Sequence, residues 1–282
     1  MSRVLPFTKM HGAGNDFVVL DGLEGELPPI EPLAARLLDR RFGIGGDQLL
    51  VVRESRTADF RMEIFNPDGS QVEMCANGIR AFYKYVRDRG HTDADEIGVE
   101  TLSGIVYPRW AGENNVTVDM GRPVLEPAKI PTTLAGGEGP VLDVPLEVGG
   151  ETVIVSSVSM GNPHAVITVD DPDTAPVIRL GPLIENHPEF PNRVNVEFVA
   201  AVDRARIRQR TWERGTGETL ACGSGACAVA VVSMLRGVSD RRVRIELRGG
   251  ELAIAWENDD AHVMMTGPAA EVFRGRFPIA EE

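Results

Sequence analysis

Several residue types on which common protein functions depend are scarce in this sequence. Only three of the 282 residues are cysteine, and Cys75, Cys222 and Cys227 cannot form a closed disulfide framework. We therefore expect three thiols in a reducing compartment. Lysine also occurs only three times, and just one of them, Lys9, stands near a glycine turn. A pyridoxal Schiff base needs such a lysine, but no other cofactor signal accompanies Lys9, so we expect no cofactor.

Long apolar runs and positive charge are lacking as well. No stretch of about 18 apolar residues occurs, and the N-terminal residues are typical of a strand and not of a signal peptide. These features predict a cytoplasmic protein with no membrane partner. The formal charge is −13 at pH 7, whereas a nucleic-acid-binding surface needs clustered lysine and arginine. We therefore expect no nucleic-acid partner.

Motifs for metals and nucleotides are missing from the sequence. It contains no C-x-x-C or H-E-x-x-H motif, and no two of its five histidines have the spacing of zinc ligands. The turn HGAGND at 11–16 lacks the third glycine of a dinucleotide fingerprint, and no G-x-x-x-x-G-K-[ST] loop occurs. The sequence thus predicts neither a metal site nor a nucleotide site.

The sequence does contain many short strands and a few helices, enough for about two domains. Each half has one strongly apolar helix, predicted at 77–89 and at about 223–236. A shorter helix is predicted at 32–41, and a helical or irregular stretch at 174–185. Because strands and helices do not alternate regularly, we expect an α+β fold and not a doubly wound sheet. The stretch 121–145 is rich in proline and glycine and is predicted to be a linker. Strands are expected at 4–10, 17–21, 48–53, 60–65, 97–101, 105–110, 116–120, 153–158, 164–169, 195–200, 207–213, 242–247, 252–256 and 262–266.

The two halves match each other at a fixed offset. A shift of 147 residues places Cys75 on Cys222 and Gly78 on Gly225. The same shift also superimposes side-chain amides, Asn15 on Asn162 and Gln48 on Asn195. Matches of this kind predict two similar domains related by a pseudo-two-fold axis. Such an axis would bring equivalent loops to opposite sides of one cleft, with the two cysteines facing a single ligand.

Both repeats place a cysteine in the same local setting. A strand and turn lead to Cys75 or Cys222, two or three small residues follow, and an apolar helix then begins. The free N–H groups and the dipole at a helix N-terminus stabilise anions, so we expect the pKa of each thiol to lie below the usual ~8.5. The same N–H groups can hold a substrate carboxylate beside the sulfur.

The alternative is that these cysteines are buried structural residues, as an isolated cysteine commonly is. The repeated setting of Cys75 and Cys222 favours a catalytic interpretation for both. Cys227 lies five residues after Cys222, inside the apolar run ACAVAVV, and is interpreted as part of the core.

Polar side chains near the two cysteine turns suit an amino-acid ligand. Amides occur in the loops of both halves, at Asn15, Gln48, Asn66, Asn77, Asn162 and Asn195. Each could be a structural turn residue, but an amide can also donate to a carboxylate and accept from an ammonium. Glu213 and Arg214 form either a solvated ion pair or a pair of ligands for one charged amino-acid end. His164, in the segment GNPH, is interpreted as a hydrogen-bonded structural histidine with a possible supporting role at the site.

Six segments together resemble the diaminopimelate epimerase family. They span nearly the whole chain in the order found in that family. They are HGAGNDFVV at 11–19, GGDQLL at 45–50, NPDGSQVEMCANGIRAF at 66–82, GNPHAV at 161–166, ENHPEFPNRVNVEF at 185–198 and ERGTGETLACGSGACAVA at 213–230.

The resemblance implies an activity and a fold. Members of the family epimerise LL-diaminopimelate to meso-diaminopimelate without a cofactor, in lysine and cell-wall precursor biosynthesis. It implies two similar α/β domains, each a mixed, mainly antiparallel sheet wrapped around a central helix, with the active site in the cleft between them. The first domain would comprise residues 1–121 and a returning tail at 268–282, and the second residues 122–267. Family members are typically homodimers, so a homodimer is expected.

The resemblance also implies roles for individual residues. Cys75 and Cys222 would be the catalytic acid and base. The implied substrate-binding residues are Asn15, Gln48, Asn66, Ala76, Asn77, Asn162, Asn195, Glu213, Arg214, Gly223 and Ser224. The family usually has glycine at the position of Ala76, where a positive φ would be strained for alanine.

Two other functions are compatible with the residues. A two-thiol racemase acting on proline or hydroxyproline is the nearest, but the charged pair Glu213 and Arg214 favours a substrate with a second amino-acid end. A non-catalytic amino-acid-binding or redox-sensing protein is the other, and saturable binding without exchange of the Cα hydrogen would indicate it.

Overall fold

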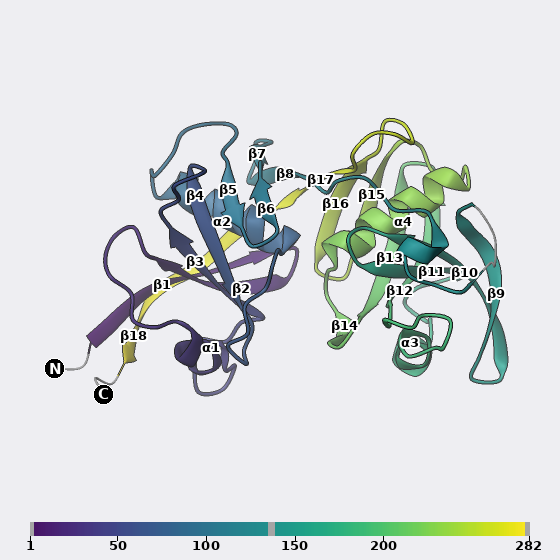
Figure 1. The fold of residues 1–282 in the computed structure, drawn as a ribbon, viewed down its shortest axis with the longest axis horizontal. Coiled ribbons are helices and arrows are strands. Elements are labelled where there is room, and N and C mark those ends of the chain that lie inside the picture. The colour runs from purple at the N-terminus through teal and green to yellow at the C-terminus, as the bar shows by residue number, and fades with distance from the viewer. Residues whose placement is uncertain (1–2, 135–138, 280–282) are drawn as a thin grey trace. The chain divides into compact units, whose positions relative to one another are not determined.

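The computed structural model describes residues 3–134 and 139–279, which form two compact units (Figure 1). The first unit comprises Met1–Val118 and Gly267–Glu282, and the second comprises Asp119–Thr266. Residues 135–138 of the expected linker and 280–282 of the expected tail lie outside the described part. Among the described residues, the structure has no helix with the length and apolar character that a bilayer crossing requires.

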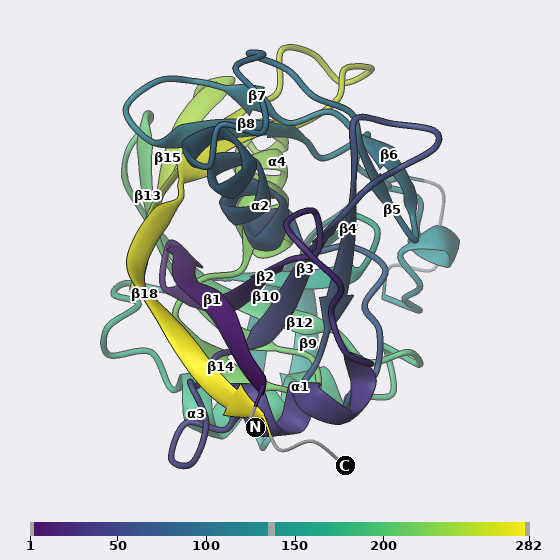
Figure 2. The ribbon, with the colours of Figure 1, turned by 90° about the vertical axis from the view of Figure 1, so that its left-hand side faces the viewer.

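The first unit contains a mixed sheet in the order β18-β1-β2-β3-β4-β5-β6. Neighbouring strands are antiparallel except for the parallel pairs β2/β3 and β4/β5. The helix α2 (Ala76–Asp88) packs against β1, β2, β3 and β18, whereas α1 (Glu31–Leu38) packs against β3. Figure 2 shows β18 running beside β1. The strands are β1 (Arg3–Gly12), β2 (Asn15–Asp21), β3 (Gln48–Arg53), β4 (Phe60–Phe65), β5 (Val99–Thr101), β6 (Gly104–Val106) and β18 (Ala270–Ile279).

The second unit contains a mixed sheet in the order β17-β16-β15-β13-β12-β11-β10-β9, and β14 also pairs with β13. Its parallel pairs are β11/β12 and β13/β15. The helix α4 (Gly223–Leu235) packs against β10, β11, β12, β15 and β16, and α3 (Val177–Glu185) packs against β9, β12, β13 and β14. The strands are β9 (Val141–Val148), β10 (Glu151–Ser159), β11 (Pro163–Thr168), β12 (Asn195–Asp203), β13 (Arg206–Glu213), β14 (Gly217–Thr219), β15 (Arg242–Leu247), β16 (Gly250–Ala255) and β17 (Met264–Pro268).

Three short elements connect these parts of the chain. The hairpin of β7 (Arg109–Trp110) and β8 (Asn115–Asp119) leads out of the first unit, and the 3-10 helix η1 (Pro127–Lys129) follows. The boundaries between the units fall within β8 and within β17.

The two units repeat the same local design. The central helices α2 and α4 both have 13 residues and begin 147 residues apart. The parallel pairs follow the same offset, because Phe17 lies opposite Gln48 and His164 lies opposite Asn195. The expectation of an α+β fold with two similar domains, each a mixed sheet around a central helix, is confirmed. The exact domain limits at 121/122 and 267/268 stay a prediction.

The strength of the apolar pattern explains how well each element could be predicted. Helix α4 is apolar on all sides, and such a helix is buried all round. The linker expected at 121–145 was wrong in part, because β9 begins at Val141. Pro145 lies within β9, which is tolerated because β9 is the last strand of its sheet and does not need that N–H for a second neighbour. Strands β14 and β18 were not expected either.

Close packing at the start of α4 makes Gly225 hard to replace. A Cβ atom at Gly225 would lie 2.6 Å from Oε1 of Glu197, a fully buried side chain on β12. At the repeat-related Gly78, a Cβ atom would meet nothing closer than 3.3 Å. The two glycines thus occupy equivalent helical positions, but a Cβ atom would have less space at Gly225 than at Gly78.

We expect Gly225→Ala to lower the free energy of unfolding by about 1–3 kcal/mol, because overpacking forces Glu197 to move. Gly78→Ala should cost less than about 1 kcal/mol, because alanine also favours the helix. Urea unfolding followed by circular dichroism measures both. Equal losses in the two variants would contradict this account.

Candidate active site

Each of the two repeat-related cysteines caps the central helix of its unit. Cys75 is the N-cap of α2 and Cys222 is the N-cap of α4, both with extended backbone. In each case the backbone N–H three residues later, of Gly78 or Gly225, donates to the Sγ atom at 3.4 Å. A side chain that accepts from the third helical N–H satisfies a donor that otherwise has no partner in the helix. The expected setting of both thiols is therefore present in the structure.

In the first unit, Asn15 joins the cysteine to a second amide. Cys75 Sγ lies 3.8 Å from Oδ1 of Asn15, and Nδ2 of Asn77 donates to the same oxygen at 3.2 Å. Nδ2 of Asn15 is held from the other side by Oδ2 of Asp47 at 2.7 Å. The amide of Asn15 is thus fixed with its carbonyl toward Cys75.

Asp47 belongs to a small network of charges at the start of β3. Arg40 bridges Asp47 and Asp16, and Lys9 donates to Asp16. Burial alone would raise the pKa of Asp16, but hydrogen bonds from Arg40 and Lys9 outweigh burial and hold that pKa well below its usual range. An ionised, paired network of this kind gives Asp47 a defined place from which to orient Asn15.

The remaining amides of the first unit lie on β3 and just after β4. Nε2 of Gln48 donates to Oδ1 of Asn66 at 3.2 Å, and Nδ2 of Asn66 donates to Ser70 at 3.1 Å. Gln48 begins β3 opposite Phe17, near the start of β2 where Asn15 contacts Cys75, and Asn66 follows the end of β4. The site residues that the sequence indicated in the first unit are all buried or half-buried. Each of them makes a side-chain hydrogen bond or lies in the helix α2.

Ala76 does not carry the strain that the sequence suggested. It is the first residue of α2 and has helical backbone. Among the described non-glycine residues, positive φ angles occur elsewhere, at Ala13, Glu113, Asn114, Asp143 and Arg193. The methyl group of Ala76 is therefore compatible with a helix N-terminus.

In the second unit, Cys222 lies among polar groups but is itself buried. Its Sγ atom is 3.6 Å from Oγ of Ser224 and is hydrogen-bonded to Glu213. Glu213 also accepts a hydrogen bond from Thr219. Gly223 and Ser224 form the first turn of α4, so their N–H groups point from the helix N-terminus.

The expected lowering of the thiol pKa is wrong for Cys222. Burial raises the pKa of the Cys222 thiol well above its usual value, and the carboxylates of Glu213 and Glu197 raise it further. Hydrogen bonds from Ser224 and Gly225 act in the opposite direction but are weaker. The helix N-terminus was the correct feature, but burial and the two acidic neighbours outweigh it. Burial likewise raises the pKa of the Glu213 carboxyl group.

Two further site residues of the second unit hold each other in place. Nδ2 of Asn195 donates to the carbonyl of Pro163 at 2.9 Å, and Oδ1 of Asn195 accepts from the backbone N–H of Arg214 at 3.0 Å. The guanidinium of Arg214 is exposed and donates to the carbonyl of Asn192. Glu213 and Arg214 do not pair with each other, so each is available for a separate charged group.

His164 is a buried, fully hydrogen-bonded histidine. Its Nδ1 atom lies 2.8 Å from Oε1 of Glu197, and its Nε2 atom lies 3.0 Å from Oδ1 of Asn162. Burial raises the pKa of Glu197, and His164 partly offsets this effect. Cys227, which the sequence assigned to the core, is indeed fully buried within α4.

Sequence reasoning missed Asp47 and Glu197, which orient residues that it did single out. Glu197 had a visible signal, since it is a lone acidic residue inside the apolar strand VNVEFV. Asp47 adjoins Gln48 in the segment GGDQLL, where its role depends on a contact with Asn15 that only the fold creates.

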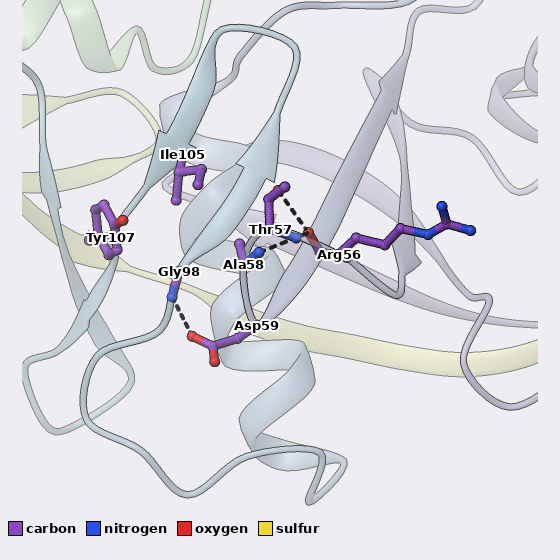
Figure 3. A pocket seen from close by; sticks show the side chains of 8 residues that line it. Arg56, Thr57, Ala58, Asp59, Gly98, Ile105 and Tyr107 are labelled. Atoms are coloured by element: carbon purple, nitrogen blue, oxygen red, sulfur yellow. Dashed lines mark hydrogen bonds between the residues drawn. The ribbon is translucent and has the colours of Figure 1, made fainter.

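Other concave or charged features of the first unit involve none of the predicted site residues. A surface pocket lies between the start of β4 and strand β6 (Figure 3). Some of its lining residues are hydrogen-bonded to each other, for example the Gly98 N–H to Asp59. Asp21, Glu24 and His91 form a group that could hold a metal ion, although His91 already contacts Asp21 at 2.8 Å. Neither the pocket nor the group of Asp21, Glu24 and His91 includes a residue of the cysteine turns.

Comparison with solved structures supports the fold. A phenazine biosynthesis protein of the PhzF family from Bacillus anthracis is 16% identical, with a TM-score of 0.73 and coverage of 98% of this chain and 100% of the other. A hydroxyproline epimerase from Agrobacterium vitis is 15% identical, with a TM-score of 0.68 and coverage of 99% and 94%. At these identities the likeness concerns the fold alone.

Comparison of sequences is more specific. A diaminopimelate epimerase from Moorella thermoacetica is 53% identical over 97% of this chain and 99% of its own length. Another from Aromatoleum aromaticum is also 53% identical, over 98% and 99%. The family profile described as diaminopimelate epimerase matches residues 7–126 and 156–272. The chain therefore belongs to the diaminopimelate epimerase family.

Proposed function

We propose that this protein interconverts LL- and meso-diaminopimelate by a two-base reaction in which Cys75 and Cys222 act on opposite faces of one α-carbon. The observation that supports the proposal is that the two thiols have the same local setting. Each caps the central helix of its unit and accepts from the N–H three residues later at 3.4 Å. Family membership supplies the substrate, because the relatives at about half identity are diaminopimelate epimerases.

Inverting the α-carbon requires that a proton leave one face and that another arrive on the opposite face. The α-hydrogen of an amino acid is a very weak acid, so a thiolate must take it while a thiol delivers the replacement. Burial and two carboxylates favour the neutral form of Cys222. A neutral Cys222 is suited to be the proton donor while Cys75 removes the proton, which is the direction from LL- to meso-diaminopimelate.

The helix N-termini supply the stabilisation of charge. The N–H groups of Ala76 and Asn77 in one unit, and of Gly223 and Ser224 in the other, have no acceptor within their helix. Such groups stabilise a carboxylate and the carbanion that develops beside it. In this proposal they stabilise the negative charge that develops at the reacting α-carbon.

The charged pair Glu213 and Arg214 supports a substrate with both charges at an amino-acid end. The guanidinium of Arg214 can bind a carboxylate, and the carboxylate of Glu213 can bind an ammonium. A bound ammonium also lowers the pKa of Glu213, which burial raises in its absence. We also propose a cytoplasmic location, since both cysteines must remain reduced.

Replacing either catalytic thiol should stop the reaction. We expect Cys75→Ala and Cys222→Ala each to lower the rate of interconversion by about 10²–10⁴-fold, because one proton transfer loses its group. Cys227→Ala is the matched control. It should keep the activity and lose about 1 kcal/mol of stability, because it removes only a buried core atom.

Deuterium uptake makes this test sharper. In D₂O the wild-type protein should produce meso-diaminopimelate with deuterium at the inverted α-carbon, as measured by NMR. Cys222→Ala should still exchange the α-hydrogen of the LL isomer through Cys75, but without inversion. An active Cys222→Ala variant, or a product free of deuterium, would rule out the two-base reaction. Turnover of proline in place of diaminopimelate would indicate the related racemase function.

The pH dependence of alkylation tests the environment of Cys222. In a Cys75→Ala background we expect iodoacetamide to modify Cys222 with a midpoint at a higher pH than a small free thiol. The reason is that burial and the nearby carboxylates delay formation of the thiolate. Glu213→Gln should move the midpoint to lower pH, because it removes one negative neighbour, whereas Glu218→Gln should not. A midpoint below that of the free thiol would contradict the assignment.

We further propose that the protein is a homodimer formed through β18. This strand is at the end of its sheet, and its side chains Val272 and Phe273 are 56% and 47% exposed. An edge strand with exposed apolar side chains is a ready surface for pairing with a second copy. Phe273 also stacks edge-on against Phe7, which holds its ring in one place.

Phe273→Asp should weaken self-association by at least about tenfold, because a charge replaces buried apolar surface. Sedimentation equilibrium gives the dissociation constant. Ile178→Asp, at another exposed apolar position on α3, should leave it unchanged. Identical behaviour of the two variants would place the interface elsewhere.

A further inference from the structure

Strand β12 presents polar side chains on one face and apolar ones on the other. Val196 and Phe198 belong to the core cluster that includes residues of α3. Asn195 and Glu197 alternate with them, and Glu197 reaches the first turn of α4 at Gly225. A carboxyl group between a sheet and a buried apolar helix is costly unless it has a partner. Its presence there therefore needs a specific explanation.

The partner of Glu197 is His164 on the adjacent strand β11. Both side chains are 0% exposed, and Nδ1 of His164 lies 2.8 Å from Oε1 of Glu197. The second ring nitrogen, Nε2, lies 3.0 Å from Oδ1 of Asn162. An amide oxygen only accepts hydrogen bonds, so Nε2 must carry a hydrogen. With its hydrogen on Nε2, a neutral imidazole can only accept at Nδ1, so the carboxyl group of Glu197 must be protonated and donate to Nδ1. Burial raises the pKa of Glu197 and favours this form.

This arrangement determines which end of the Asn162 amide is available to a ligand. Its oxygen is occupied by His164, and Nδ2 makes no hydrogen bond with any residue in 3–134 or 139–279. The repeat-related Asn15 is held the opposite way, with Nδ2 on Asp47 and the oxygen toward Cys75. The two amides occupy matching positions of the repeat but present opposite chemical groups.

We propose that Glu197 is a positioning residue for the reaction: through His164 it holds the amide of Asn162 with the oxygen inward and Nδ2 outward, as a donor to a carboxylate of the substrate. This inference rests on the proposed function, because it assumes an amino-acid ligand at the Cys222 turn. Without Glu197, the imidazole can carry its hydrogen on Nδ1, and the amide of Asn162 can then turn over. The ligand carboxylate would meet an amide oxygen in place of an N–H group.

Two substitutions of Glu197 distinguish its role in orienting His164 from the simple filling of space. In Glu197→Gln, the side-chain amide can donate to Nδ1 and keep the hydrogen on Nε2. In Glu197→Leu, the volume is similar but Nδ1 loses its partner. We expect Glu197→Leu to raise KM for diaminopimelate about tenfold, as for the loss of one hydrogen bond to a charged group, with kcat changed less than about threefold. Glu197→Gln should restore KM to within about threefold of the wild-type value.

Gln209→Leu is the matched control. Gln209 is a polar side chain on the neighbouring strand β13, 2% exposed, and its Nε2 atom donates to Oγ1 of Thr211. Replacing it by leucine tests the effect of an apolar substitution in the same sheet, and KM should not change. A rise in KM in Gln209→Leu equal to that in Glu197→Leu would overturn the proposal, as would equal KM values for Glu197→Leu and the wild type.

A measurement without substrate tests the positioning role of Glu197 independently of the proposed catalytic function. In protein labelled with ¹⁵N-histidine, NMR identifies which ring nitrogen of His164 carries hydrogen, with His164→Gln used to assign the signal. We expect a hydrogen on Nε2 in the wild type and in Glu197→Gln, and loss of this preference in Glu197→Leu. A wild-type His164 without hydrogen on Nε2 would overturn the proposal even if Glu197→Leu failed to fold. Absence of epimerisation by the wild type would instead refute the proposed function.

Discussion

The hydrogen bond between a helix N-terminus and a cysteine sulfur is the interaction on which the rest of the site depends. A capping side chain must accept from the third helical N–H, and a serine or aspartate would do so with oxygen. Sulfur caps both helices here, and in the proposed reaction the same atom would also exchange a proton with carbon. This double role fixes the sulfur within the first turn and explains the small residues that follow each cysteine, since Gly78 and Gly225 leave room for it.

The surroundings of the two sulfurs have diverged although the caps have remained alike. Cys75 faces a carbonyl oxygen of an amide that an ionised network holds from behind. Cys222 is buried beside two carboxyl groups, and burial, followed by these groups, raises the pKa of its thiol. In the proposed reaction one thiol acts as acid and the other as base, and unequal environments of this kind suit such a division.

The sequence allowed much of this fold to be predicted, because its signals are local or repeated. The apolar run of α4 and the offset of 147 residues between Cys75 and Cys222 identified the helices, their caps and the two similar domains. What it could not reveal depends on contacts between distant segments. Glu197 is 25 residues before Cys222 in the chain, and only the pairing of β11, β12 and α4 brings its charge to the sulfur. The local rule for helix termini therefore gave the wrong direction for the pKa of Cys222.

The opposite anchoring of Asn15 and Asn162 makes the two halves of the chain no longer interchangeable. The carbonyl oxygen of Asn15 and the N–H group of Asn162 make the two units chemically different, although their backbones repeat the same local design. In the proposed reaction, the partner behind each asparagine would therefore decide which chemical group meets the ligand, an oxygen at Asn15 and an N–H group at Asn162.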